Sequence, residues 1–88
     1  MPKQGITAED IRIHCREKYI VPARMRGEKQ ISIRVGDVHR DLGLKSRFGS
    51  VDDAIGANVF QTMANVKRLS KSGPPHAPNA VFLFKILP

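Results

Sequence analysis

The first third of this chain carries apolar residues at helical spacing. Ile11, Cys15 and Tyr19 recur every four residues, which places them on one face of a helix. Residues 7–10 have the pattern of a capping box and predict the start of that helix. Pro22 is expected to end it near residue 19, because an interior proline removes a hydrogen bond and clashes with the preceding turn.

The period then changes twice within a short stretch. Ile31, Ile33 and Val35 alternate with polar residues, which predicts a half-buried strand over residues 30–35. Apolar residues next recur at three- and four-residue spacing, so a helix is expected over residues 35–42. Gly43 is placed to end it in left-handed geometry.

A basic turn, residues 45–49, leads to a second predicted helix over residues 50–57. Ser50 is expected as its N-cap, with Asp53 at the third helical position. Gly56 or Asn58 should end or interrupt this helix. Residues 59–64 are ambiguous, and the spacing of their apolar residues favours one more helical turn.

The last part of the chain predicts a hairpin. Residues 66–71 and 80–87 flank a loop rich in glycine and proline, residues 72–79. The run 81–87 is nearly all apolar and is expected to be the central strand, with residues 31–35 adding a third. The fold class is therefore predicted as α+β, with about three helices and a small three-stranded antiparallel sheet. Residues 1–88 are expected to form a single domain, with 1–6 as a flexible lead.

The amino-acid composition is informative mainly through its charge. Fifteen Lys and Arg against eight Asp and Glu give a net charge of +7, which favours a polyanionic partner. A single cysteine excludes an internal disulfide and a cysteine-rich metal site. No apolar run reaches the roughly 20 residues of a membrane span, and the first residues lack the apolar segment of a signal peptide. A soluble cytoplasmic protein with no membrane partner is expected, nucleoid-associated or nuclear if it binds DNA.

The order of helix, strand, helix, turn, helix and hairpin resembles the winged-helix family of helix-turn-helix DNA-binding domains, over roughly residues 7–87. In that resemblance residues 35–42 match the support helix, 50–57 the recognition helix and 72–79 the wing. Two features depart from the pattern: the turn 43–49 is longer than usual, and the second helix is short with Asp52 and Asp53 in its first turn. The resemblance implies a DNA-binding protein, acting in transcription regulation or as an accessory subunit.

Candidate contacts to nucleic acid follow from charge and position. The turn offers two cations and a hydroxyl close to free helix N–H groups, a combination suited to a phosphate. The hairpin has cations on its strands and polar groups at its tip, and Asp52 is expected to be exposed and to add limited base readout. The predicted set comprises Arg40, Lys45, Ser46, Arg47, Ser50, Asp52, Lys67, Arg68, Lys71, His76 and Asn79.

The sequence gives less support to catalysis or metal binding. His39-Arg40-Asp41-Leu42 matches the start of a protein-kinase catalytic loop, but the asparagine that motif needs is Ser46 here. We interpret the match as chance and expect His39 and Asp41 to be exposed. The histidines fit no metal-ligand spacing, so no metal, cofactor or enzymatic activity is predicted. The alternatives left open are a protein-interaction module, including a homodimer, and RNA binding.

Overall fold

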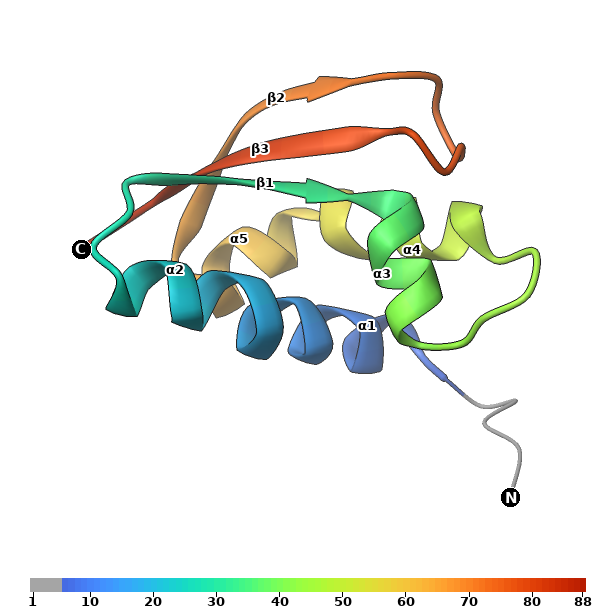
Figure 1. Ribbon diagram of the computed structural model, residues 1–88, viewed down its shortest axis with the longest axis horizontal. Coiled ribbons are helices and arrows are strands. Elements are labelled where there is room, and N and C mark those ends of the chain that lie inside the picture. Colours follow the sequence, from blue (N-terminus) through green and yellow to red (C-terminus); the bar gives the residue numbers. More distant parts are fainter. Residues whose placement is uncertain (1–5) are drawn as a thin grey trace.

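The computed structural model describes residues 6–88 and has an α+β architecture of two layers. A three-stranded antiparallel sheet lies over a layer of helices, and the helices cover one face of the sheet (Figure 1). The α+β class and the three-stranded antiparallel sheet are therefore confirmed. The predicted flexible lead falls on residues 1–5, which lie outside the described residues, and on Ile6, which packs against the hydrophobic core.

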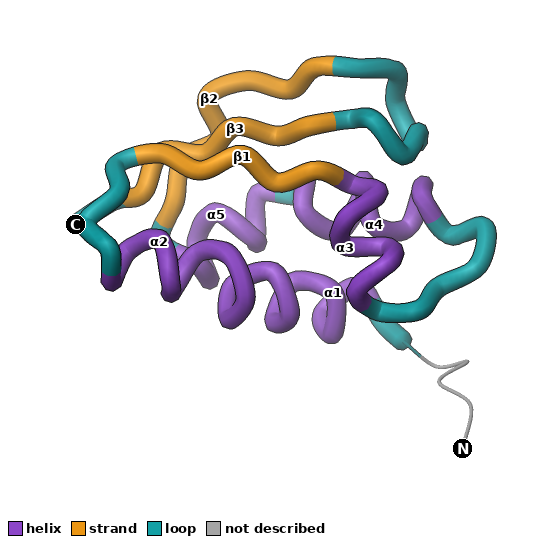
Figure 2. The backbone as a smooth tube through the Cα atoms, in the orientation of Figure 1, coloured by secondary structure: helices purple, strands orange, loops and turns teal. Residues whose placement is uncertain are grey.

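The first helical rod continues past the proline that was expected to end it. It comprises α1 (Ala8–Cys15), a π-helical turn η1 (Arg16–Ile20) and α2 (Val21–Met25), which follow one another without a break (Figure 2). The capping box at its start is confirmed. The prediction that Pro22 stops the helix is wrong. A wider π turn immediately precedes Pro22, and we attribute the tolerance of its ring to that turn.

The sheet has the order β1-β3-β2, so the apolar C-terminal strand is central, as predicted. Its strands are β1 (Gln30–Arg34), β2 (Val66–Ser72) and β3 (Val81–Ile86). Both pairings are antiparallel, and β2 carries an irregularity in register between Arg68 and Ser70. Alternate residues of β3, namely Phe82, Phe84 and Ile86, are buried against the helices.

Helix α3 (Val35–Asp41) follows β1 directly and ends as the sequence predicts. Gly43 adopts a positive φ of 64°. Its N–H donates to the carbonyl of Arg40 at 3.1 Å, and the Leu44 N–H donates to that of His39 at 3.1 Å. These are the paired bonds of a Schellman motif, which satisfy the last carbonyls of a helix.

Two short helices then lead to the hairpin. Helix α4 (Phe48–Gly56) starts earlier than expected, with Arg47 as N-cap and no side-chain cap, so the prediction of Ser50 as N-cap is wrong. Helix α5 (Asn58–Ala64) confirms the predicted extra helical turn, and Asn65 ends it at φ 56°. The core between these helices and the sheet contains Ile11, Cys15, Ile33, Ile55, Phe60 and Phe84, each at most 2% exposed.

Candidate nucleic-acid interface

His39 of α3 fixes the position of the basic turn between α3 and α4. The Nε2 atom of His39 accepts a hydrogen bond from the Arg47 N–H at 3.1 Å, and its ring stacks on Phe48 with centroids 4.0 Å apart. Burial lowers the pKa of His39, which keeps the ring neutral and able to accept. The prediction that His39 is exposed is wrong, because its ring packs on Phe48 and accepts the Arg47 N–H. Phe48 is accordingly a packing residue.

The cations of this turn have no acidic partner among the described residues. Lys45 is exposed, and Ser46 lies at φ 54° at the top of the turn. Arg47 is half-buried and, with Arg12, Ser50 and Asp53, lines an open pocket of about 260 Å³. No side chain caps the first turn of α4, and Ser50 of that turn lines this pocket.

The hairpin loop is hydrogen-bonded to α4 through the buried carboxylate of Asp52. One oxygen of Asp52 accepts from Lys71 Nζ and the other from the His76 N–H, both at 2.9 Å. The Asp52 side chain is only 6% exposed. The prediction that Asp52 is exposed and reads bases is therefore contradicted: both oxygens are occupied within the protein. Its neighbour Asp53 is exposed and lies 3.1 Å from the His76 ring.

The same loop also contacts the start of α3. The Gly36 N–H donates to the Pro78 carbonyl at 2.8 Å. A side chain at Gly36 would place its Cβ 2.7 Å from that oxygen, so only glycine allows this approach. The loop is thus held by both α3 and α4, while Asn79 is exposed on it.

Several arginines bind the carbonyl ends of helices. Arg68 Nη1 donates to the Gly56 carbonyl at 2.7 Å, and Arg12 Nε donates to that of Ala54 at 2.9 Å. Arg24 donates to the carbonyls of Ala64 and Asn65. These bonds satisfy carbonyls that the helices leave free, and the positive charge is favourable at a helix C-terminus.

A second open pocket lies on the other side of α4. It has a volume of about 230 Å³, and its lining includes Arg68, Lys71 and Asp53. Asp53 lines both pockets, so it lies on the part of α4 that separates them. We call this strip the α4 ridge and define it as Ser50, Asp53 and Gly56 of α4 together with Ala57, the residue that follows the helix. All four have small side chains, and each side of the ridge carries two cations.

Two predicted contact residues lie away from the ridge. Lys67 on β2 is the direct cross-strand partner of Lys85 on β3, on the face of the sheet that the helices leave open. Arg40 is exposed on α3, where its guanidinium lies 3.4 Å from Asp37. The structure therefore brings Arg47, Ser50, Arg68, Lys71 and His76 around α4, and it leaves Lys67 and Arg40 outside that group.

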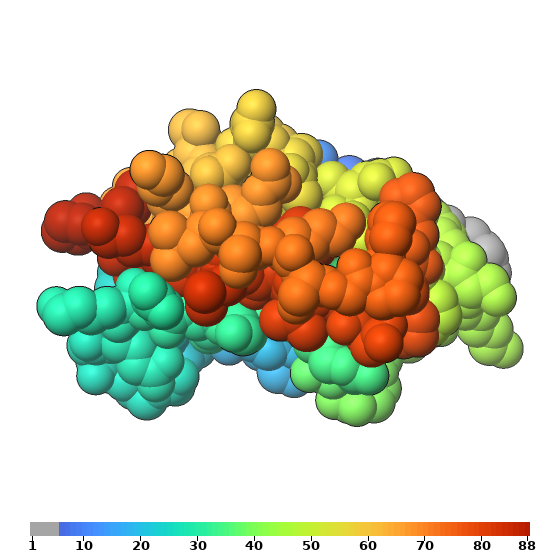
Figure 3. All heavy atoms as spheres, turned by 90° about the horizontal axis from the view of Figure 1, so that it is seen from above, coloured from blue at the N-terminus to red at the C-terminus, as the bar shows by residue number. Residues whose placement is uncertain are grey.

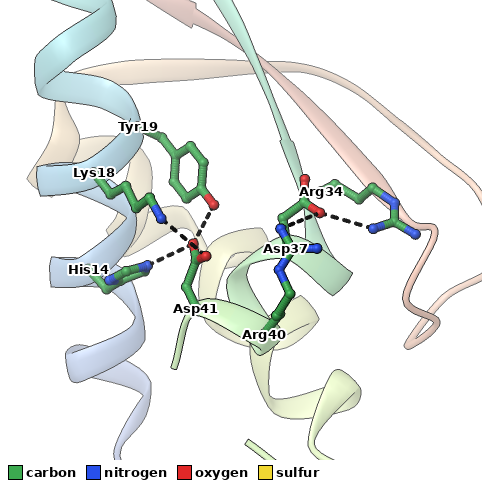
Figure 4. A network of polar contacts seen from close by, with 7 residues as sticks. All are labelled: His14, Lys18, Tyr19, Arg34, Asp37, Arg40 and Asp41. Carbon is green, nitrogen blue, oxygen red and sulfur yellow. Dashed lines mark hydrogen bonds and ion pairs between the residues drawn. The ribbon is translucent and has the colours of Figure 1, made fainter. Parts of the chain in front are cut away.

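A polar network between α3 and the first helical rod was not predicted from the sequence. Asp41 was expected to be exposed, but its side chain is 10% exposed and is contacted by Tyr19, His14 and Lys18 from the first helical rod (Figure 4). Burial alone would raise the pKa of Asp41, but the hydrogen bonds from these three side chains outweigh it and lower the pKa. Burial and the Asp41 charge together raise the pKa of the nearby Cys15 thiol to about 12. The network joins α1 and η1 to α3.

Asp52, Asp53 and His76 form a group whose possible ligand atoms lie within 4.8 Å of one another. Spacing along the chain could not reveal it, because more than twenty residues separate the aspartates from the histidine. The Lys71 ammonium and the His76 N–H already neutralise and bond Asp52. We therefore interpret the group as the contact that holds the hairpin loop.

Comparisons with known proteins identify no relative: no protein-family profile, curated protein or solved structure matches the chain. Within residues 6–88, none of the helices has the length and apolar character needed to cross a membrane.

Proposed function

We propose that this chain is a winged-helix protein that binds duplex DNA by placing α4 against a groove with phosphates on both sides. The observation that supports this most is the α4 ridge: a strip of small side chains with Arg12 and Arg47 on one side and Arg68 and Lys71 on the other. Small side chains let a helix approach closely, and flanking cations match the two backbones of a groove.

The order of elements supports the same proposal. A strand, a helix, a turn, a second helix and a hairpin follow one another, and the first strand joins the two hairpin strands in a sheet of order β1-β3-β2. In a helix-turn-helix protein the second helix enters the major groove and the first crosses the backbone. By this analogy α3 is the support helix, α4 the recognition helix and the predicted loop 72–79 the wing.

Phosphate contacts would dominate the binding. Lys45 and Arg47 have no acidic partner within residues 6–88, so they are the cations that would gain most from a phosphate. Arg68 and Lys71 keep donor groups beyond those that bond Gly56 and Asp52, and they would contact the opposite strand. Ser50 could reach base edges, and the exposed carboxylate of Asp53 would oppose the approach of phosphates. Sequence readout would be limited, which fits a small regulator or an accessory subunit.

The experiment is a salt titration of binding to a fluorescein-labelled mixed-sequence duplex, followed by anisotropy from about 50 to about 200 mM salt. We expect affinity to fall steeply with salt. Lys45→Ala and Arg47→Ala should each reduce the slope of log K against log salt by about one. Arg26→Ala is the matched control: it removes the same charge from an exposed arginine that pairs with Glu28 away from α4, and should leave the slope unchanged.

The outcomes separate the alternatives. Absence of binding at the lowest salt would refute the nucleic-acid proposal and leave the protein-interaction alternative. Equal slope losses in Arg47→Ala and Arg26→Ala would show that only net charge matters and would refute the role of the turn. Stronger competition by single-stranded RNA than by the duplex would replace DNA by RNA as the ligand.

A further inference from the structure

The sheet has one face that no helix covers. All described helices lie on the other face, as Figure 1 shows from the side, and Figure 3 views the molecule from above. Alternation along β3 places Val81, Leu83 and Lys85 on this open face, because Phe82 and Phe84 face the core. Their cross-strand partners complete the face: Gln30, Ser32 and Arg34 on β1, and Lys67, Ser70 and Ser72 on β2.

This face is positively charged at Lys67 and Lys85, whereas Arg34 at its edge pairs with Asp37. None of the three strands contains an aspartate or a glutamate. Lys67 and Lys85 are direct cross-strand partners, and neither forms an ion pair with any of the described residues. Like charges directly opposite each other on a sheet are destabilising. An anion bound between the two ammonium groups would remove that repulsion.

The centre of the face is apolar and its margin is polar. Val81 and Leu83 are half-buried on the central strand, and serines of the two outer strands lie beside them. An apolar centre with a polar margin is the usual composition of a protein-binding surface. A phosphate backbone would gain nothing from the two aliphatic side chains, and the strand residues of this face include no aromatic ring on which a base could stack.

We propose that the open face of the sheet binds an extended acidic segment of a partner protein. Carboxylates of the segment would lie near Lys67 and Lys85, and its apolar side chains would cover Val81 and Leu83. A second copy of this chain is a poor occupant, since each copy carries a net charge of +7. The surface is on the opposite side of the sheet from α4, so this inference does not depend on DNA binding.

The probe for the test is a synthetic peptide of the repeat glutamate–serine–valine–serine, which presents glutamate and valine on the same side when extended. It is titrated into the ¹⁵N-labelled full chain and followed by amide chemical shifts. We expect shifts at Lys67, Val81, Leu83 and Lys85. The double variant Lys67→Glu/Lys85→Glu should weaken binding at least about tenfold, because attraction becomes repulsion at two positions. The same peptide with serine in place of valine should bind more weakly, and the one with lysine in place of glutamate should not bind.

Lys45→Ala/Arg47→Ala serves as the control, since it changes the turn and should leave peptide affinity unchanged. If the charge-reversed variant does not fold, Lys67→Ser/Lys85→Ser replaces it, with a smaller loss expected. The proposal is overturned if no shifts occur at millimolar peptide, if the shifts lie on α4, or if the double variant binds the peptide as well as the unchanged chain. Shifts of these sheet amides by duplex DNA would also overturn it, by assigning the face to nucleic acid.

Discussion

Replacing Asp41 by asparagine should destabilise the protein much more than the same change at Asp37 on the same helix. Both aspartates lie on α3, and Figure 4 shows that each is contacted by basic side chains. The Asp41 side chain is 10% exposed, and the partners that reach it come from the first helical rod. The Asp37 side chain is 36% exposed, and its partners are Arg34 and Arg40 nearby in the chain.

The magnitude follows from the contacts that asparagine cannot keep. The Tyr19 hydroxyl can still donate to the amide oxygen. The contacts of His14 at 3.2 Å and Lys18 at 3.1 Å lose the negative charge. A hydrogen bond to a charged group contributes about 1.5–3 kcal/mol, and Lys18, being half-exposed, recovers most of its loss from water. We therefore expect Asp41→Asn to cost about 2 kcal/mol, and Asp37→Asn about 0.5 kcal/mol or less.

The assay is urea unfolding followed by far-ultraviolet circular dichroism, at neutral pH and at successively lower pH. Because the fold lowers the pKa of Asp41 from its ordinary value of 3.8, the stabilisation is present above that value and is lost as pH falls through the folded-state pKa. The difference between the unchanged protein and Asp41→Asn should therefore shrink in acid. A loss at neutral pH as small as that of Asp37→Asn, or one that does not change with pH, would refute the reasoning.

Three further substitutions test the contacts around α4. Asp52→Asn should lower the free energy of unfolding by about 2 kcal/mol, because the buried carboxylate bonds Lys71 and the His76 N–H. It should also speed hydrogen exchange of the His76 amide, and unchanged exchange would contradict this prediction. Burial lowers the pKa of His39 from 6.5, so the protein loses stability as pH falls below that value. His39→Gln does not titrate and should remove this part of the pH dependence of urea unfolding. An equal loss of stability in acid in both proteins would contradict this prediction. Asp53→Asn removes a negative charge from the α4 ridge and should tighten duplex binding about threefold in the anisotropy assay, whereas weaker binding would indicate that Asp53 contacts a base.

Periodicity along the chain predicted the framework of the fold. The alternation of Ile31 and Ile33 marked β1, and the apolar run 81–87 marked the central strand of the sheet. Gly43 ended α3 as expected, because the Schellman motif depends on a few adjacent residues. These features are set locally, so the sequence alone is enough to predict them.

The contacts of individual polar side chains could not be predicted in this way. Asp52 is buried because Lys71 and His76 reach it from the hairpin, about twenty residues later. Asp41 is buried because Tyr19 and its neighbours reach it from the first helical rod. Helix-capping patterns and local charge interpret these two aspartates from residues adjacent in the sequence. Their actual partners lie close to them only in the folded chain. For the same reason the two pockets beside the α4 ridge have no signature in the sequence.

The surface proposed to meet DNA is α4 with its flanking cations, and an NMR titration can locate the contact directly. Duplex DNA is added to the ¹⁵N-labelled chain at low salt, and the amides that shift are mapped. We predict shifts at Lys45, Arg47, Ser50 and Asp53, with smaller ones in the hairpin loop. Shifts confined to the open face of the sheet around Lys85, or no shifts at saturating duplex, would show that α4 does not contact DNA.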